Sequence, residues 1–482
     1  MADFYHGVST RQVETSVSTP VEADSGVPFV VGTAPVHTVG GKVNVPILAY
    51  TYEEAVTALG FSDNWGDYTL CEMIYSHYRL YERAPVVFVN VLDPEKHRKQ
   101  TAETNYPVKD GKVYLPLEAM KETVTVKGGA DATAFTEGED YELFYDGENL
   151  ILEIVEGSAI PEDLGELSIT FYSVDPSQVT KKEIIGGFDV NTKKYSGFEL
   201  MDSVFAKYTI VADLLVCPKW STDSEVAAIM SAKSGNINGV FEGKALVDAD
   251  AETVRHYTDV PAWKKKANLF SKQQVVCWPM VKLGDRKFHL SVQMAGLMAK
   301  VDTDNGGCPA ESPSNKLLQI DSAVLADGTE INLDLVQANY LNSNGVVTAL
   351  NFIGGYVLWG NETACFPSNT DVKDYFIPVS RMFGWVSNSI VLSYWSKLDK
   401  KMTRRLIDSI VDSVNIWLNG LTAEEKLLGG RVEFRDSENS LTALMAGKAV
   451  FHLYITPPSP AKELEFVLEY DVSYVESALK AA

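Results

Sequence analysis

The sequence has few cysteines and no long apolar run. Its 482 residues include five cysteines, Cys71, Cys217, Cys277, Cys308 and Cys365, which are widely spread and form no Cys-x-x-Cys pair. This number and spacing argue against a disulfide framework and against a structural zinc site. Cys71, Cys217 and Cys277 lie in apolar runs, so we expect buried free thiols in a chain that folds in a reducing cytoplasm. No run reaches about 18 apolar residues, which predicts no transmembrane helix.

Basic residues are also scarce. The chain carries 42 Lys+Arg against 65 Asp+Glu, a formal net charge of −23. This excess argues against a protein that wraps nucleic acid or lies on an anionic membrane. The first residues, MADFYHGVSTRQVETSV, contain neither a basic nor an apolar region of the kind found in secretory signal peptides. The hydrophobic share of 45% predicts a folded protein, and the length suggests about three domains.

Motifs for catalysis and for metal or nucleotide binding are missing or incomplete. The chain has no Gly-x-Ser-x-Gly and no His-Glu-x-x-His. The run 239–245 resembles a P-loop, but it has one residue too few between its glycines and Ala245 where a hydroxyl must hold magnesium, so we expect a glycine turn before a strand. The run 302–313 begins like a calcium loop, but Gly306 and Pro313 occupy ligand positions, so we expect an Asx-rich turn. The seven histidines show no ligand spacing. We therefore predict no catalytic residue, no metal site and no cofactor.

Two separated parts of the chain have the pattern of an α/β domain. In residues 26–100, a buried strand begins at Pro28, Thr51 and Glu54 have capping-box spacing at the start of a helix, a second helix spans 68–81, and 85–91 is a continuously apolar strand. Strands are again expected at 208–216, 244–248 and 274–280, with a helix at 224–233. This pattern predicts a mixed or parallel sheet covered by helices, formed by residues 26–100 and 181–365.

Residues 101–180 have a different pattern. Short alternating runs at 124–127, 141–145, 150–154 and 167–172 are separated by turns rich in Gly, Asp and Glu. Such runs, with no helix of convincing length between them, predict a compact all-β module of the barrel or sandwich type. The simplest account is an α/β core domain that is interrupted by this inserted module.

The two ends of the chain are predicted to be arms. Residues 1–25 are polar and cannot bury a core, so we expect them to become ordered only against another surface. Residues 366–461 are assigned to an α+β C-terminal domain with a strongly amphipathic helix at 403–421. In the final arm, 462–482, residues 463–474 alternate with period two, broken only by Val467, which predicts a long half-buried strand. Its apolar face consists of Leu464, Phe466, Leu468, Tyr470, Val472 and Tyr474.

One basic cluster interrupts the acidic background. It consists of Lys397, Lys400, Lys401, Arg404 and Arg405 and leads into the N-terminal end of the helix at 403–421. Cations at that end of a helix oppose its dipole, at a cost of a few tenths of a kcal/mol each. This unfavourable placement suggests an acidic partner surface. A solvated face that uses Asp399, Asp408 and Asp412 as partners explains the cluster equally well.

Several segments together resemble the contractile tail sheath family of bacteriophage tails and phage-tail-like particles. They are Ala295-Gly-Leu-Met-Ala299 followed by Asp302 and Ser312-Pro-Ser-Asn315, then Gly355-Tyr-Val-Leu-Trp-Gly360, Tyr375-Phe-Ile-Pro-Val-Ser-Arg-Met-Phe383, the helix ending in Trp417-Leu-Asn-Gly420, and the strand after Pro457-Pro-Ser-Pro-Ala461. Residues 1–290 resemble the family in layout. After Gly360 the sequence continues Asn-Glu-Thr, where the family often has an arginine.

The resemblance implies a structural subunit and no enzyme. Such a subunit polymerises in stacked rings as a helical array around a tail tube, and contracts to drive the tube through a target cell envelope, with the energy stored in the metastable extended assembly. Partners would be further copies, the tail tube, the baseplate and the tail terminator, with no nucleic acid and no membrane insertion. The location would be a virion or phage-tail-like particle that is assembled in the bacterial host cytoplasm.

The resemblance also assigns roles to the arms and to the basic cluster. Both arms would supply strands to neighbouring subunits, through the apolar face of 464–474 and through Val8, Val13 and Val17. The cluster Lys397 to Arg405 would face the tube.

Two other classes of protein remain as alternatives. An α/β enzyme of hydrolase type with a β accessory module predicts a polar pocket at the carboxyl ends of the strands, with clustered titratable groups. A surface-binding or adhesion protein is the other alternative, although it lacks the expected secretion signal.

Overall fold

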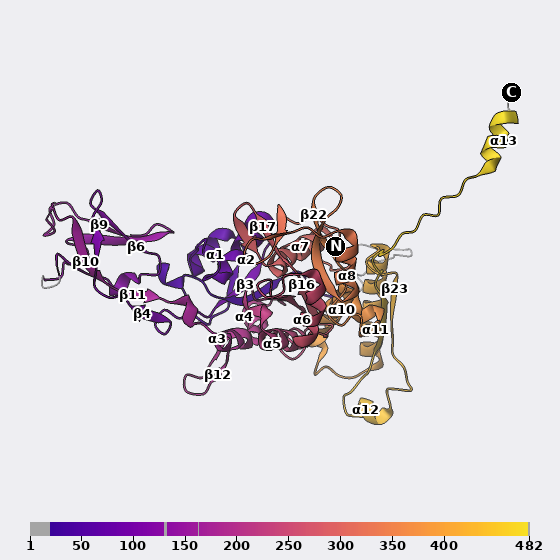
Figure 1. The fold of residues 1–482 in the computed structure, drawn as a ribbon. Coiled ribbons are helices and arrows are strands. Elements are labelled where there is room, and N and C mark those ends of the chain that lie inside the picture. The colour runs from indigo at the N-terminus through magenta and orange to yellow at the C-terminus, as the bar shows by residue number, and fades with distance from the viewer. Residues whose placement is uncertain (1–19, 130–132, 162, 481–482) are drawn as a thin grey trace, which may run out of the picture.

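The computed structural model describes residues 20–129, 133–161 and 163–480. Figure 1 shows strands β6, β9 and β10 of the module at one end of the molecule, the α/β core in the middle, and α11 and β23 at the other end. The C-terminal residues lead away from this body. Within the described ranges, no helix has both the length and the apolar character needed to cross a membrane.

The core is built on an eight-stranded sheet with the order β2-β3-β1-β14-β15-β16-β21-β22. The inner pairs are parallel, whereas β2 and β22 at the edges pair antiparallel. The predicted mixed sheet with helices is therefore confirmed. The strands are β1 (Pro28–Gly32), β2 (Ile47–Ala49), β3 (Val86–Asn90), β14 (Leu214–Val216), β15 (Lys244–Asp248), β16 (Gln274–Cys277), β21 (Val346–Asn351) and β22 (Tyr356–Trp359).

The sequence patterns of the core helices agree with the structure, with one local change. Thr51 caps the first helix and its Oγ1 accepts from the Glu54 N–H at 3.1 Å. The helix predicted at 68–81 begins as α-helix and continues as π-helix over 75–80. The helices are α1 (Tyr52–Leu59), α2 (Thr69–Ile74), α3 (Lys181–Ile185), α4 (Val204–Tyr208), α5 (Ser224–Ser234), α6 (Val260–Lys266), α7 (Leu290–Asp304) and α8 (Leu335–Ser343).

The strand predicted at 208–216 is too long. Tyr208 ends α4, because Thr209 takes a left-handed conformation with φ of 60°, and only Leu214–Val216 forms β14. The residues between them are held by the N-terminal segment instead of by a strand: the Val211 N–H donates to Asp24 Oδ2 at 3.4 Å. The apolar content of 208–216 predicted the longer strand, but the contact between Val211 and Asp24, which is far away in the sequence, shortens it.

A second apolar core lies within residues 101–180. Leu115, Leu143, Leu152 and Ile169 are among its buried side chains, and they do not join the core of the central sheet. Its sheets have the orders β5-β10-β7 and β6-β9-β8, and the pair β11-β4 lies at its root. The strands are β4 (Arg98–Gln100), β5 (Thr104–Pro107), β6 (Lys112–Pro116), β7 (Thr125–Lys127), β8 (Tyr141–Tyr145), β9 (Asn149–Ile154), β10 (Glu166–Thr170) and β11 (Tyr172–Val174).

The C-terminal domain packs two long helices against a small sheet. Its elements are α9 (Val372–Tyr375), α10 (Ile377–Tyr394), α11 (Arg404–Ala423), β23 (Gly429–Glu433), α12 (Leu441–Met445) and β24 (His452–Thr456). The predicted helix at 403–421 is confirmed, with Thr403 as its N-cap. Two minor sheets complete the fold, β12 (Gly187–Asp189) with β13 (Lys194–Ser196), and β17 (Met280–Leu283) with β18 (Arg286–Phe288), β19 (Ser322–Val324) and β20 (Glu330–Ile331).

The strand predicted at 463–474 is not formed in the single chain. Residues 457–471 have no assigned secondary structure, and Val472–Lys480 form a helix, α13. The helix begins where the Asp471 carboxylate accepts from the Ser473 N–H at 2.9 Å, as an N-terminal cap does. A strand also needs a neighbour to take its backbone hydrogen bonds, and this arm projects from the body with none beside it (Figure 1).

Candidate assembly site

A buried ion pair joins the C-terminal domain to the core. Arg381 of α10 donates through Nη1 to Asp302 Oδ1 of α7 at 2.9 Å, and through Nη2 to Asp213 Oδ2, next to β14, at 3.2 Å. Ser25 Oγ also donates to Asp302, at 2.7 Å. Burial alone would lower the pKa of Arg381, but the two carboxylates outweigh it and raise that pKa above its ordinary value. The pair thus ties α10, α7, the sheet and the root of the N-terminal arm together.

This pair changes where the turn predicted at 302–313 begins, because residues 302–304 are helical and turns follow from 305. Asp302 is fully buried in the last turn of α7, and its carboxylate is used by Arg381 and Ser25. In the described part of the chain, no group of three or more His, Cys, Asp or Glu side chains is arranged to hold a metal ion.

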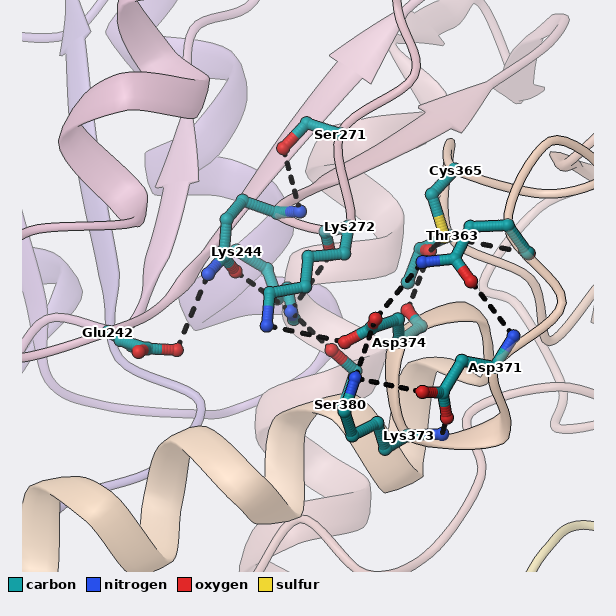
Figure 2. A network of polar contacts seen from close by, with 12 residues as sticks. Glu242, Lys244, Ser271, Lys272, Thr363, Cys365, Asp371, Lys373, Asp374 and Ser380 are labelled. Carbon is teal, nitrogen blue, oxygen red and sulfur yellow. Dashed lines mark hydrogen bonds and ion pairs between the residues drawn. The ribbon is translucent and has the colours of Figure 1, made fainter.

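A polar network continues this connection (Figure 2). Lys244, the lysine of the P-loop-like run, starts β15 and donates to Ser380 Oγ of α10 at 2.7 Å and to Gln273 Oε1 at 2.9 Å. Its ammonium group is buried among neutral acceptors, so desolvation lowers its pKa to about 7. Lys272 pairs with Asp374 of α9 at 3.3 Å. Lys244 therefore fixes the C-terminal domain on the sheet, and a turn before a strand is the correct interpretation of this run.

Titratable groups do cluster at the carboxyl ends of the strands, as the enzyme alternative predicts. The buried Asp248 ends β15, and its oxygens accept from the Ser291 N–H at 2.9 Å and from Ser221 Oγ at 3.0 Å. Beside it, Glu72 accepts from His289 Nδ1 at 2.9 Å; burial lowers the pKa of His289, but Glu72 raises it to about 9 overall. Asp248 is hydrogen-bonded to the two serines and Glu72 to His289, and these contacts hold α2, α7 and the sheet together.

The C-terminal arm begins in a cleft of about 830 Å³. Lys462 pairs there with Glu362, at 2.7 Å between Nζ and Oε1, and the Glu362 side chain is only 3% exposed. The Lys462 ammonium also lies 5.2 Å from the centre of the Phe366 ring. The root of the arm is therefore anchored on the body, and the following residues extend into solvent.

The apolar face of the arm is exposed along its whole length. The exposed fractions are 75% for Leu464, 82% for Phe466, 95% for Leu468, 81% for Tyr470, 62% for Val472 and 74% for Tyr474. In the single chain Val472 and Tyr474 lie in α13, whereas Leu464, Phe466, Leu468 and Tyr470 lie in the segment without secondary structure. Val8, Val13 and Val17 lie outside the described residues. The segment 20–25 is described and runs along the C-terminal domain, where Ala23 O accepts from Trp385 Nε1 at 2.8 Å.

The basic cluster lies in the connection between α10 and α11 and at the start of α11. Arg404 pairs with Asp408 at 2.9 Å, whereas no ion pair is found for Lys397, Lys400, Lys401 or Arg405 within the described ranges. The same connection exposes three apolar side chains that the charge pattern did not single out, Trp395 at 63%, Leu398 at 60% and Met402 at 39%. The surface is therefore both basic and apolar.

These features define a chain built to assemble, with an exposed apolar arm, a two-stranded sheet and a basic surface grouped at its C-terminal end. No protein-family model matches the chain. The tail sheath protein of Burkholderia phage BcepMu is 28% identical over 98% of this chain and 98% of that protein. The resemblance to sheath proteins is thereby confirmed, and the chain is a homologue of phage tail sheath proteins.

Solved structures agree on the fold. The sheath complex of an extracellular contractile injection system, PVC, in its contracted state, has a chain with a TM-score of 0.58 at 12% identity, covering 98% of this chain and 99% of that one. A chain of the anti-feeding prophage baseplate has a TM-score of 0.58 at 14% identity, covering 97% and 100%. At these identities the likeness concerns the fold alone.

Proposed function

We propose that this protein is the structural subunit of a contractile tail sheath. Copies polymerise in stacked rings as a helical array around a tail tube, and contraction of the array drives the tube through a target cell envelope. The full-length relationship to a phage tail sheath protein carries this proposal. The shared fold with a sheath chain in a contracted assembly supports it.

Strand exchange connects the copies in this proposal. Apart from Val467, residues 463–471 alternate between apolar and acidic side chains; the run is exposed and has no assigned secondary structure in its own chain. Such a segment is stabilised by joining the edge of a sheet in another copy, where its backbone hydrogen bonds and its apolar face are both satisfied. The N-terminal arm supplies a second strand, through Val8, Val13 and Val17.

The basic cluster contacts the tail tube. Lys400, Lys401, Arg404 and Arg405 are exposed on the C-terminal domain of an otherwise acidic chain. Charged contacts on an exposed surface are weakened by salt and are individually weak. Contacts of this kind can hold the extended array on the tube and still separate when the array contracts.

The domain boundaries support a division of tasks. Residues 26–100 and 181–365 form the core, 366–461 the tube-side domain, and 101–180 an outward module that can vary without disturbing the array.

The extended assembly stores energy because the contracted one buries more interface. The baseplate and the tail terminator are the partners at the two ends, and the particle assembles in the bacterial host cytoplasm.

Electron microscopy of the purified full chain in negative stain tests the proposal. Sheath-like tubes are expected, without added nucleotide. Uniform small particles at high protein concentration would argue against a sheath. The enzyme alternative draws no support from the relatives that the chain matches, since these carry sheath names.

A further inference from the structure

A small hairpin projects from the core domain. It consists of β12 and β13, and Figure 1 shows it extending away from the body. Its turn is closed by its own side chains, since the Asp189 carboxylate accepts from the Asn191 N–H and from Thr192 Oγ1, both at 2.8 Å. At its base, the Gly197 N–H donates to Asn44 Oδ1 at 3.1 Å. These contacts hold the hairpin in one conformation before any partner binds, which lowers the entropy cost of binding.

The hairpin presents apolar side chains to solvent. The exposed fractions are 50% for Phe188, 76% for Val190 and 52% for Tyr195. The rings of Phe188 and Tyr195, which are opposite each other in the hairpin, lie 4.9 Å apart. A cluster of exposed apolar side chains on a projecting element is typical of a surface that binds another protein.

A second exposed apolar surface lies at the β22 edge of the central sheet. We call it the edge patch, and its exposed side chains come from the segment before β19, from α8 and from the bend between β21 and β22. They are Leu317, Leu335, Val336, Tyr340, Phe352 and Ile353.

Contacts within the chain bring the parts of the edge patch together. A Cβ atom at Gly355, in the bend, would lie 3.4 Å from the Leu317 side chain. Tyr356 OH donates to Asn332 Oδ1 at 3.3 Å, which places the start of α8 beside the same bend. Val336 and Tyr340 are four residues apart on α8 and therefore lie on one face of it.

The hairpin and the edge patch belong to different ends of the central sheet. Asn44, which holds the base of the hairpin, donates its N–H to Asn90 O at the end of β3 at 2.8 Å. Five strands, β1, β14, β15, β16 and β21, lie between β3 and β22. Figure 1 shows β12 on the lower side of the body and β22 on the upper side. One chain cannot bring the two surfaces into contact, but two copies can.

The charges beside the two surfaces are complementary. Lys193 and Lys194 are exposed on the hairpin, next to its apolar side chains. Asp334 is exposed at the start of α8, and Glu330 is exposed four residues before it. Lys316, which precedes Leu317, pairs with Glu311 at 3.8 Å. A second copy of this chain therefore fits the edge patch both in polarity and in the sign of its charge.

We propose that the hairpin 187–196 of one copy binds the edge patch of the next copy, so that the core domains are joined head to tail. This inference rests on the proposed function and adds a contact between core domains, separate from the exchanged strands. Because the two surfaces differ and lie far apart, the contact is heterologous, and its repetition gives an open array instead of a closed dimer.

Chemical cross-linking of assembled tubes tests which surfaces meet. The five natural cysteines are buried, so thiols introduced at exposed positions can be linked by a short bis-maleimide. Tubes of the Val190→Cys, Val336→Cys chain are expected to give a ladder of linked chains on a denaturing gel. Val190→Cys with Val372→Cys, whose second position is 45% exposed on α9, is the control and is expected to give none.

The outcomes separate the inference from the proposed function. Tubes that give no ladder, or that give an equal ladder in the control, would overturn the hairpin contact and leave the sheath proposal intact. Failure of the unsubstituted chain to form any tube would overturn the sheath proposal instead.

A single substitution tests the contribution of the hairpin to assembly. Val190→Asp is expected to raise the lowest protein concentration at which tubes form on the order of tenfold, because the contact would bury a carboxylate in place of an apolar side chain. The thermal midpoint of the unassembled chain should not change, since Val190 is exposed there. Tubes that form at the concentration of the unsubstituted chain would overturn the inference.

Discussion

Arg381 and Asp302 are 79 residues apart in the sequence and form a buried ion pair at 2.9 Å. The arginine comes from the segment 375–383, and the aspartate follows the segment 295–299 near the end of α7; both belong to segments that resemble the sheath family. The pair therefore gives a physical reason for both residues. It fixes the C-terminal domain, which carries the arm and the basic cluster, on the sheet of the core.

Breaking this pair is expected to destabilise the chain strongly. Arg381→Met leaves the buried carboxylates of Asp302 and Asp213 without a cation, which costs about 3–5 kcal/mol in unfolding free energy. Arg404→Met removes an exposed pair and is expected to cost less than about 1 kcal/mol. Denaturant unfolding of both variants measures the two values, and equal losses would mean that the buried pair does not tie the domains.

Removing the C-terminal arm is expected to abolish assembly and leave folding intact. A chain ending at residue 463 lacks the exposed face of 464–470 but keeps the four apolar clusters of the described residues and the Lys462–Glu362 ion pair. Its thermal midpoint should match that of the full chain, because the deleted apolar face is exposed in the single subunit. Microscopy should then show no tubes. Tubes formed by the shortened chain would refute strand exchange by this arm.

Reversing the basic cluster is expected to separate tube binding from sheath formation. A chain with Lys400, Lys401, Arg404 and Arg405 changed to Glu presents like charge to an acidic tube, so extended sheaths on tubes should be lost. Empty contracted sheaths should still form. Lys265→Glu with Lys266→Glu, on an exposed part of α6, is the control for the added negative charge. Co-assembly with the tube protein measures the effect, and unaltered loading would reject the tube-facing surface.

The buried Lys244 is expected to make stability depend on pH. Burial lowers its pKa to about 7, whereas an unfolded lysine has a pKa of about 10.4. Between these values the unfolded chain binds more protons, so this group makes stability rise with pH, by at most about 1.4 kcal/mol per pH unit. Unfolding free energies at pH 7 and 8.5 should therefore rise less in Lys244→Met than in the unsubstituted chain. A difference of zero, or of the opposite sign, would contradict a neutral Lys244.

Local patterns predicted the parts of the fold that depend on local chemistry. The stripe of Ile407, Val414 and Leu418 predicted α11, and the continuously apolar runs predicted parallel strands buried on both faces. Thr51 and Glu54 predicted the start of α1, because a helix cap is a hydrogen bond between residues that are close together in the sequence.

The missed features depend on contacts between distant residues. The Asp302 carboxylate and Arg381 come together only when two domains pack, and no spacing in the sequence reports that. Strict alternation predicted a strand at 463–474, but alternation fixes which face a side chain takes and does not supply a partner strand.

The central claim is that copies of this chain form a sheath through exchanged strands. Helical reconstruction by cryo-electron microscopy of tubes grown from the full chain tests it most directly. The account predicts density for residues 464–470 of one copy at the edge of a sheet in another. Tubes in which each arm stays on its own subunit, or a preparation with no tubes at all, would contradict it.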